Sequence, residues 1–408
     1  MFVFPINRVP DEMNHARMTW ETLHRPTENS FKWMEEIPSN DKVKPTEYKQ
    51  LLARKIEMKN EPFRFGISLK TISFIPQLIG MTIGSWLSPT VGMIIYMGRI
   101  FNALAYILGL YFLIRYFKYG KIAVMFISLL PIMVQQASSL SYDVMNYLEV
   151  MLAIGFITNL AYSKRFSNRN FVQVIGLAIL LLATKPNNIL LLGLIPFVSF
   201  EFKGVLKTLN RPFKSLKLIV SRYKFVFYLL LLITIGFILQ FLMRNEGGLF
   251  HYIHVLLNTL VDAKQNGDLN SILTIGIFGF LGNFTLQLPL WLIFVDVAVL
   301  FLIFLADKKN FFSKDFSILA ALLFPIQVIA TVTVMYLQWT PIVLGHGASV
   351  SVGSQGRYFT PFLILFLPLV ANLGHFEISQ NKVLKISTAT LLVNYLISIF
   401  LIIPYYWM

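Results

Sequence analysis

Long apolar segments recur along this chain from about residue 90 to its end, and they constrain its fold more than any other feature. A transmembrane helix needs about 20 mostly apolar residues. Ten segments approach that length: 91–114, 121–138, 143–162, 170–184, 187–202, 224–243, 288–306, 316–338, 357–373 and 385–406. Because 56% of the residues are hydrophobic and only 13% are charged, lipid must be the solvent for much of this surface. The sequence predicts an all-α, polytopic membrane protein.

Three apolar segments allow more than one arrangement. Segments 170–184 and 187–202 are short, so they could form two tilted spans or one broken hairpin. The segment 66–84 is interrupted by Lys70 and Pro76. We expect it to form a helix that lies at the membrane interface or re-enters the bilayer.

The loops between the expected spans differ in positive charge. The Lys- and Arg-rich set comprises residues 115–121, 163–170, 203–224, 307–315 and 374–385, and the poor set comprises 138–142, 185–186, 244–287 and 339–357. The two sets hold eighteen and four basic residues. Because basic residues gather in cytoplasmic loops, we expect the poor set on the outer side. The same rule accounts for the net charge of +15, so we do not expect nucleic-acid binding.

The first 65 residues differ in kind from the remainder. They contain 11 Lys or Arg, 10 Asp or Glu and no long apolar segment. This pattern predicts an external region of loops and short helices at residues 1–65, followed by a multi-pass transmembrane domain at residues 66–408. The apolar opening at residues 1–6 is typical of the last turn of a span, so we expect a first transmembrane helix just upstream.

A cluster of polar residues opens the external region. Pro10 and Asp11 predict a helix start, with Asp11 as the capping residue, and His15 lies on the same side of that helix. The structural alternative is that Asp11 only caps the helix, with Glu12, His15 and Arg17 in solvent. The functional alternative is that a carboxylate accepts a proton from a hydroxyl group, or binds a divalent cation such as Mg²⁺ or Mn²⁺ near phosphate.

Two further charged residues fall at expected membrane edges on the outer side. Asp143 follows a Ser-rich segment and could simply cap the helix that begins there. Lys185 follows a short apolar segment and could extend its ammonium group to the interface. Their functional alternative is a shared cavity that opens to the outside, because charges at membrane depth are costly unless they are paired or hydrated.

The last motif is the segment 354–361, in which Gln355, Arg357 and Tyr358 open an expected span. The guanidinium fork of Arg357 suits phosphate or pyrophosphate. Gly356 would let the backbone approach a ligand closely. The structural alternative is that Arg357 anchors the span at the membrane interface.

Other polar features carry weaker expectations. Arg99, Glu149 and Asp296 lie within expected spans, where each marks a functional site or pairs inside the bundle. The segment 278–283 is typical of an amphipathic helix on the membrane surface. The absence of Cys excludes disulfides and thiolate metal sites.

These motifs occur together, in order, along the whole chain: VPDEMNHAR at 9–17, FIPQLIG at 74–80, MGRIFN at 97–102, LP at 130–131, SSLSYD at 138–143, TKPNN at 184–188 and SQGRYFTP at 354–361. In these stretches the chain resembles a bacterial multi-pass membrane family, the domain of unknown function 2142, which is grouped with the C-type (GT-C) glycosyltransferases. The resemblance implies a GT-C-like fold in the bacterial cell membrane, with its active face outward.

The resemblance also implies an activity and roles for residues. The enzyme would transfer a sugar from a polyprenyl-phosphate donor to a glycan or glycopolymer acceptor outside the cell. Asp11 would be the catalytic base or a metal ligand, with Glu12 next to it, and Lys185 and Arg357 would hold the lipid phosphate. The remaining substrate-binding residues would be His15, Arg17, Asp143, Gln355 and Tyr358. Two alternatives stay open, a transporter or flippase of lipid-linked saccharides and a non-catalytic polysaccharide-assembly protein.

Overall fold

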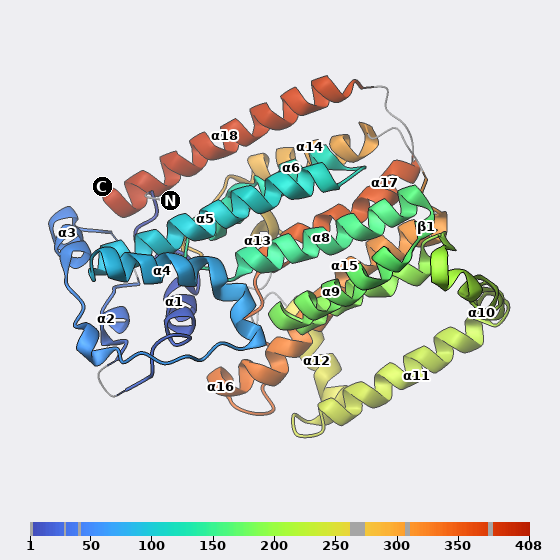
Figure 1. The fold of residues 1–408 in the computed structure, drawn as a ribbon, viewed down its shortest axis with the longest axis horizontal. Coiled ribbons are helices and arrows are strands. Elements are labelled where there is room, and N and C mark those ends of the chain that lie inside the picture. The colour runs from blue at the N-terminus through green and yellow to red at the C-terminus, as the bar shows by residue number, and fades with distance from the viewer. Residues whose placement is uncertain (1–2, 28–29, 40–41, 262–273, 307–310, 374–377) are drawn as a thin grey trace.

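The computed structural model describes residues 3–27, 30–39, 42–261, 274–306, 311–373 and 378–408. These residues are mostly helical (Figure 1). The α-helices are α1 Glu12–Trp20, α2 Lys32–Glu35, α3 Pro45–Ala53, α4 Ile75–Leu87, α5 Val91–Tyr116, α6 Lys121–Ser128, α7 Pro131–Ala137, α8 Asp143–Ser163, α9 Asn168–Thr184, α10 Asn210–Arg222, α11 Lys224–Leu242, α12 Gly248–Leu260, α13 Ile275–Phe278, α14 Leu290–Ala306, α15 Lys314–Gln338, α16 Thr340–Leu344, α17 Leu367–Leu373 and α18 Gln380–Trp407.

Short 3₁₀ helices and strands connect these helices. The 3₁₀ helices are η1 Met58–Asn60, η2 Leu69–Phe74, η3 Pro186–Phe197, η4 Gly204–Leu209, η6 Gly356–Tyr358 and η7 Thr360–Phe366. Two strand pairs complete the described structure: β1 Arg165–Phe166 runs parallel to β2 Glu201–Phe202, and β3 Phe280–Leu281 runs antiparallel to β4 Leu286–Gln287.

Five helices are long and apolar enough to cross a membrane, namely α5, α8, α11, α15 and α18. The helix α9, the 3₁₀ helix η3, the helix α14 and the continuous segment of η7 and α17 are apolar but shorter. The all-α membrane architecture is therefore confirmed, whereas the number of ten spans stays a prediction. The expected span 121–138 is broken into α6 and α7 at Pro131, because proline has no N–H to donate to the preceding turn.

The segments for which the sequence allows more than one arrangement pack closely against neighbouring helices. The helix α9 ends at Thr184, and η3 then packs back against it, an arrangement that both the two-span and the broken-hairpin alternatives allow. In the segment 66–84, η2 leads into α4, which packs along α5. A Cβ atom at Gly80 would lie 2.3 Å from the carbonyl oxygen of Met97, so the glycine allows the two backbones to touch.

The N-terminal region, residues 3–65, packs on one end of the helix bundle through its own apolar cluster. Trp20, Trp33 and Met34 of this region share one buried apolar cluster with Met81 of α4 and Ile94 of α5. Figure 1 shows the blue helices α1 to α3 gathered at that end, beside the C-terminus of α18. The packing places the start of α1 against the ends of the long helices.

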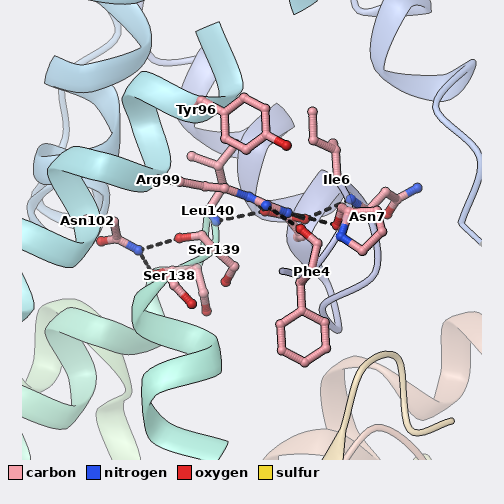
Figure 2. Close-up of polar contacts among 12 residues, drawn as sticks. Phe4, Ile6, Asn7, Tyr96, Arg99, Asn102, Ser138, Ser139 and Leu140 are labelled. Atoms are coloured by element: carbon pink, nitrogen blue, oxygen red, sulfur yellow. Dashed lines mark hydrogen bonds and ion pairs between the residues drawn. The ribbon is translucent and has the colours of Figure 1, made fainter. Parts of the chain in front are cut away.

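A buried ion pair anchors the start of α1 (Figure 2). Arg99 of α5 donates from Nε and Nη2 to the two carboxylate oxygens of Glu12, each at 2.7 Å, and neither side chain is exposed. Arg99 also donates to the carbonyl oxygens of Phe4 and Pro5. Glu12 accepts a further bond from the backbone N–H of Leu140, so one pair joins α1, α5 and the segment before α8.

The segment 278–283 is not an amphipathic surface helix, and that expectation is wrong. Phe278 ends the short helix α13 and is buried, and β3 begins two residues later. Gly282 has a left-handed φ of 63° in the turn of the β3–β4 hairpin. Its N–H donates to the side chain of Gln135 in α7, so the hairpin packs inward against the bundle.

Replacing Arg99 with Met should lower the free energy of unfolding by about 3–5 kcal/mol, because Glu12 would remain buried without its cation. Thermal unfolding of the detergent-solubilised protein measures this loss. The double variant Arg99→Met/Glu12→Gln should recover part of the stability, because it also removes the buried charge. As the matched control, Arg17→Gln breaks exposed ion pairs on the same helix and should cost less than about 1 kcal/mol. Equal losses for the buried and exposed pairs would contradict the assignment of Arg99 as an anchor.

Candidate functional site

Four segments that are far apart in the sequence bring their charged side chains into one cluster. Nη2 of Arg357 lies 2.8 Å from Oδ2 of Asp11, and its Nε lies 3.2 Å from Oδ2 of Asp143. The ammonium group of Lys185 lies 2.8 Å from Oδ1 of Asp143. The cluster therefore alternates acids and cations in the order Asp11, Arg357, Asp143, Lys185.

The ends of helices position these residues. Asp11 immediately precedes α1, Asp143 begins α8 and Lys185 separates α9 from η3. Arg357 lies in η6. Since α8 runs from Asp143 to the opposite end of the bundle, the cluster belongs to one end of the molecule.

Asp11 occupies the expected capping position, but its side chain does not cap the helix. Its φ is 62°, in the left-handed region that non-glycine residues rarely adopt. The carboxylate instead accepts hydrogen bonds from Arg357 and, at 3.0 Å, from the side-chain amide of Gln355. Such backbone strain persists only where the surroundings hold it, and it is frequent at functional sites.

Asp11 is also the most accessible member of the cluster. Its side chain is 33% exposed, whereas those of Asp143 and Arg357 are almost fully buried. Asp11 borders an open hollow of about 370 Å³, whose other polar lining residues are Asn7, Asn14, Arg17, Glu35, Ser39 and Asn283. A ligand with hydroxyl groups could therefore reach the carboxylate of Asp11 from the hollow.

Arg357 retains an unused donor. Its Nη1 atom is buried and has no hydrogen-bond partner among the described residues. The same holds for Oε1 of Gln355 and for the hydroxyl group of Ser354. Buried polar groups are nearly always paired in proteins, so unpaired groups beside a charged cluster indicate a place for water or ligand.

Tyr358 and Tyr142 line the lysine side of the cluster. The Nζ atom of Lys185 lies 3.6 Å from the ring centroid of Tyr358 and 5.5 Å from that of Tyr142. A cation over an aromatic face is attracted by the electrons of the ring. Both rings therefore help to hold the ammonium group near Asp143.

Burial lowers the pKa of His15 below the usual histidine value, although the negative charges of Asp143 and Asp11 oppose this shift. Its ring packs on Tyr142, with centroids 4.4 Å apart, and Nδ1 has no hydrogen-bond partner among the described residues. A neutral imidazole therefore lies beside the two acids at neutral pH.

The pKa of Asp11 is set by opposing effects. Burial raises the pKa, but the positive charge of Arg357 and the hydrogen bonds from Arg357 and Gln355 lower it by more. The net shift is below the usual aspartate value, so Asp11 is ionised at neutral pH. Any ligand that draws Arg357 away would raise the pKa of Asp11.

The structure brings most of the expected site residues together, but Glu12 and Arg17 lie apart from the cluster. Glu12 is turned to Arg99, and Arg17 forms exposed ion pairs with Glu21 and Glu35. Gly356 approaches the backbone of Gly276 instead of leaving space for a ligand: a Cβ atom there would lie 2.1 Å from the carbonyl carbon of Gly276.

The carboxylates do not fit the expected divalent cation. Glu12 is fully engaged by Arg99, and Asp11 and Asp143 are each bound by cationic side chains. Within the part of the chain that the structure describes, no three His, Asp or Glu side chains are grouped so as to hold a metal ion. We therefore assign no metal-dependent step to these residues.

Sequence reasoning missed the contributions of Tyr142 and Asn283. Tyr142 lies between His15 and Lys185, and it directly precedes Asp143 in a segment that had been singled out. Asn283 lines the hollow from the β3–β4 turn, a long-range contact for which the sequence offers no signal. The segment that contains this turn had been expected to form an amphipathic helix on the membrane surface.

The fold and site define a multi-pass helical membrane protein with a charged cluster at one end of its bundle. Residues 2–366 match the model of a family described as predicted membrane protein (DUF2142), and the chain belongs to that family. No curated protein and no solved structure matches the chain.

The low pKa of His15 predicts a pH dependence of stability. The folded protein resists protonation of this imidazole, whereas the unfolded chain takes up the proton near the usual histidine pKa of 6.5. The contribution of His15 to stability should therefore be complete above that pH and decline as the pH falls below it. The decrease in melting temperature from pH 7 to pH 5 should be larger for the wild type than for the His15→Gln variant. Equal falls would contradict a neutral, buried imidazole.

Proposed function

We propose that the cluster is the active site of a membrane glycosyltransferase, which transfers a sugar from a polyprenyl-phosphate donor to an acceptor at the outer surface of a bacterial cell. The observation that carries this proposal is the position of Asp11. Its carboxylate faces an open polar hollow on one side and the buried Arg357 on the other. A base beside an acceptor pocket and a cation beside a leaving group are the two requirements of such a transfer.

In the proposed reaction, a hydroxyl oxygen of the acceptor attacks the anomeric carbon of the donor sugar. The bond between that carbon and the phosphate oxygen breaks, and the electron pair leaves with the lipid phosphate. Asp11 accepts the proton of the attacking hydroxyl group. The unpaired Nη1 of Arg357 and the ammonium group of Lys185 stabilise the negative charge of the departing phosphate.

Donor binding would prepare the base. A phosphate that binds Arg357 competes with Asp11 for the same guanidinium group. Losing this partner raises the pKa of Asp11 from its lowered value and makes the carboxylate a stronger base. Asp143 keeps Arg357 and Lys185 close together during this exchange, because it contacts both cations.

The location of the cluster supports an enzyme over the transporter alternative. Transporters of known fold bind their cargo near the middle of the membrane, between repeated halves. Here the charged residues lie at helix ends and beside the external N-terminal region. A lipid phosphate would remain at that depth while its chain stays in the bilayer.

The outward orientation is part of the proposal and rests on the loop charges. The cluster lies on the side of the basic-poor loops, which the positive-inside rule assigns to the exterior. The sugar acceptor would then be a cell-surface glycan or glycopolymer.

Replacing Asp11 with Asn should lower turnover by about 10²–10⁴-fold, because the amide cannot accept the proton. The test compares the sugar composition of surface glycopolymer from cells that lack the gene and are complemented with wild-type or variant protein. The variant should insert and fold normally but leave the polymer as in the deletion strain.

The matched control for this test is Glu47→Gln, which removes an exposed carboxylate from the same external region. It should restore the wild-type polymer. Identical polymers in deletion and wild-type strains, or full restoration by Asp11→Asn, would contradict the proposal and favour a non-catalytic assembly role.

A further inference from the structure

A basic amphipathic segment lies at the end of the bundle opposite the charged cluster. It comprises the 3₁₀ helix η4 and the helix α10, residues 204–222. The two ends are connected by α8, which begins at Asp143 in the cluster and ends next to β1. Since β1 pairs with β2, and η4 and α10 follow β2, this segment belongs to the far end (Figure 1).

Most of the positive charge of this segment has no acidic partner among the residues that the structure describes. Between residues 202 and 245 the sequence contains eight Lys or Arg and no Asp or Glu. Lys207, Arg211 and Lys214 are exposed and form no ion pair with a described residue. A positive surface of this kind, whose basic side chains lack acidic partners among the described residues, attracts anions from outside the protein.

The helix α10 carries its basic residues and its exposed apolar residues on different sides. Arg211 and Lys214 are three residues apart and lie on one side of the helix. Leu216 and Ile219, also three residues apart, lie on another side and are 57% and 56% exposed. No part of the described chain covers them, so an apolar medium must lie beside this helix.

The neighbouring helix α11 shows what that medium is. It is the most apolar of the five long helices, and none of its spanning window is buried against the protein. It stands apart from the bundle in Figure 1, and α10 leads into it at Tyr223. A span with all its sides exposed is surrounded by lipid, so α10 lies where the bilayer meets water.

The helix α10 is attached to the bundle through Phe213, whose ring packs on Phe200 and Phe202, and through Lys217. The ammonium group of Lys217 donates to the carbonyl oxygen of Val198 at 3.1 Å and lies 4.8 Å from the ring centroid of Phe213. Lys217 thus attaches the helix to the bundle. The remaining basic side chains are left to face the membrane surface.

We propose that η4 and α10 form a docking surface for anionic phospholipid headgroups, with Lys207, Arg211 and Lys214 binding the phosphates and Leu216 and Ile219 inserted among the acyl chains. The partner is a lipid because only a lipid supplies a negative headgroup and an apolar chain at the same depth. This surface is independent of the proposed transferase activity.

The test measures binding of a fluorescent phosphatidylglycerol to the full-length protein in detergent, with phosphatidylcholine as the neutral probe. The triple variant Lys207→Gln/Arg211→Gln/Lys214→Gln should bind phosphatidylglycerol about a hundredfold more weakly, roughly fivefold for each charge removed. Phosphatidylcholine should bind weakly to both proteins. Size-exclusion chromatography checks that the triple variant is folded. If the triple variant does not fold, the same binding measurement is made on the single variant Lys214→Gln, which should bind phosphatidylglycerol about fivefold more weakly than the wild type.

The matched control is Lys314→Gln/Lys382→Gln/Lys385→Gln, which removes the same charge from exposed positions at the starts of α15 and α18. It should bind phosphatidylglycerol as the wild type does. Equal losses in both triple variants, unchanged binding by the α10 variant, or equal binding of phosphatidylcholine would overturn the proposal. Full displacement of the lipid by inorganic phosphate would also overturn it, since it would indicate a site for free phosphate.

Discussion

The ion pair between Arg99 and Glu12 is the interaction on which the arrangement of the site depends. Two charges without solvent cost several kcal/mol to bury, and here the cost is offset by bidentate geometry and by further hydrogen bonds to backbone groups. The pair fixes the first turn of α1 against α5. Because Asp11 is the residue before Glu12, the same pair determines where the accessible carboxylate lies. Glu12 thus supports the site without facing it.

The charged cluster itself is balanced but incompletely hydrogen-bonded. Its two acids and two cations neutralise one another, which allows three of the four side chains to be buried or nearly buried. One nitrogen of Arg357 remains unpaired, and Asp11 remains partly open to the hollow. A closed structural salt bridge would have neither property. This combination of neutrality and unused bonding capacity is why we regard the cluster as a site for an anionic ligand.

The sequence predicted the membrane class, and it singled out the four charged residues that the structure brings together, because charges at membrane edges are rare and each is costly. It could not predict which acid serves which cation. Asp11 and Glu12 are adjacent, and only the fold shows that one faces Arg357 and the other Arg99. Nor could it predict the 3₁₀ geometry after Arg357, the break at Pro131 or the inward β3–β4 hairpin. The hairpin depends on the contact of Gly282 with Gln135, 147 residues away, which periodicity does not encode.

The contact between Gly356 and Gly276 limits which substitutions members of the family can accept beside Arg357. The two backbones meet next to Arg357, with no room for a side chain at Gly356. A substitution there would displace the guanidinium group although it alters no charge and touches no ligand. Natural variation at this pair of glycines should therefore be restricted, and relatives that have lost one of them should have displaced or rebuilt the charged cluster.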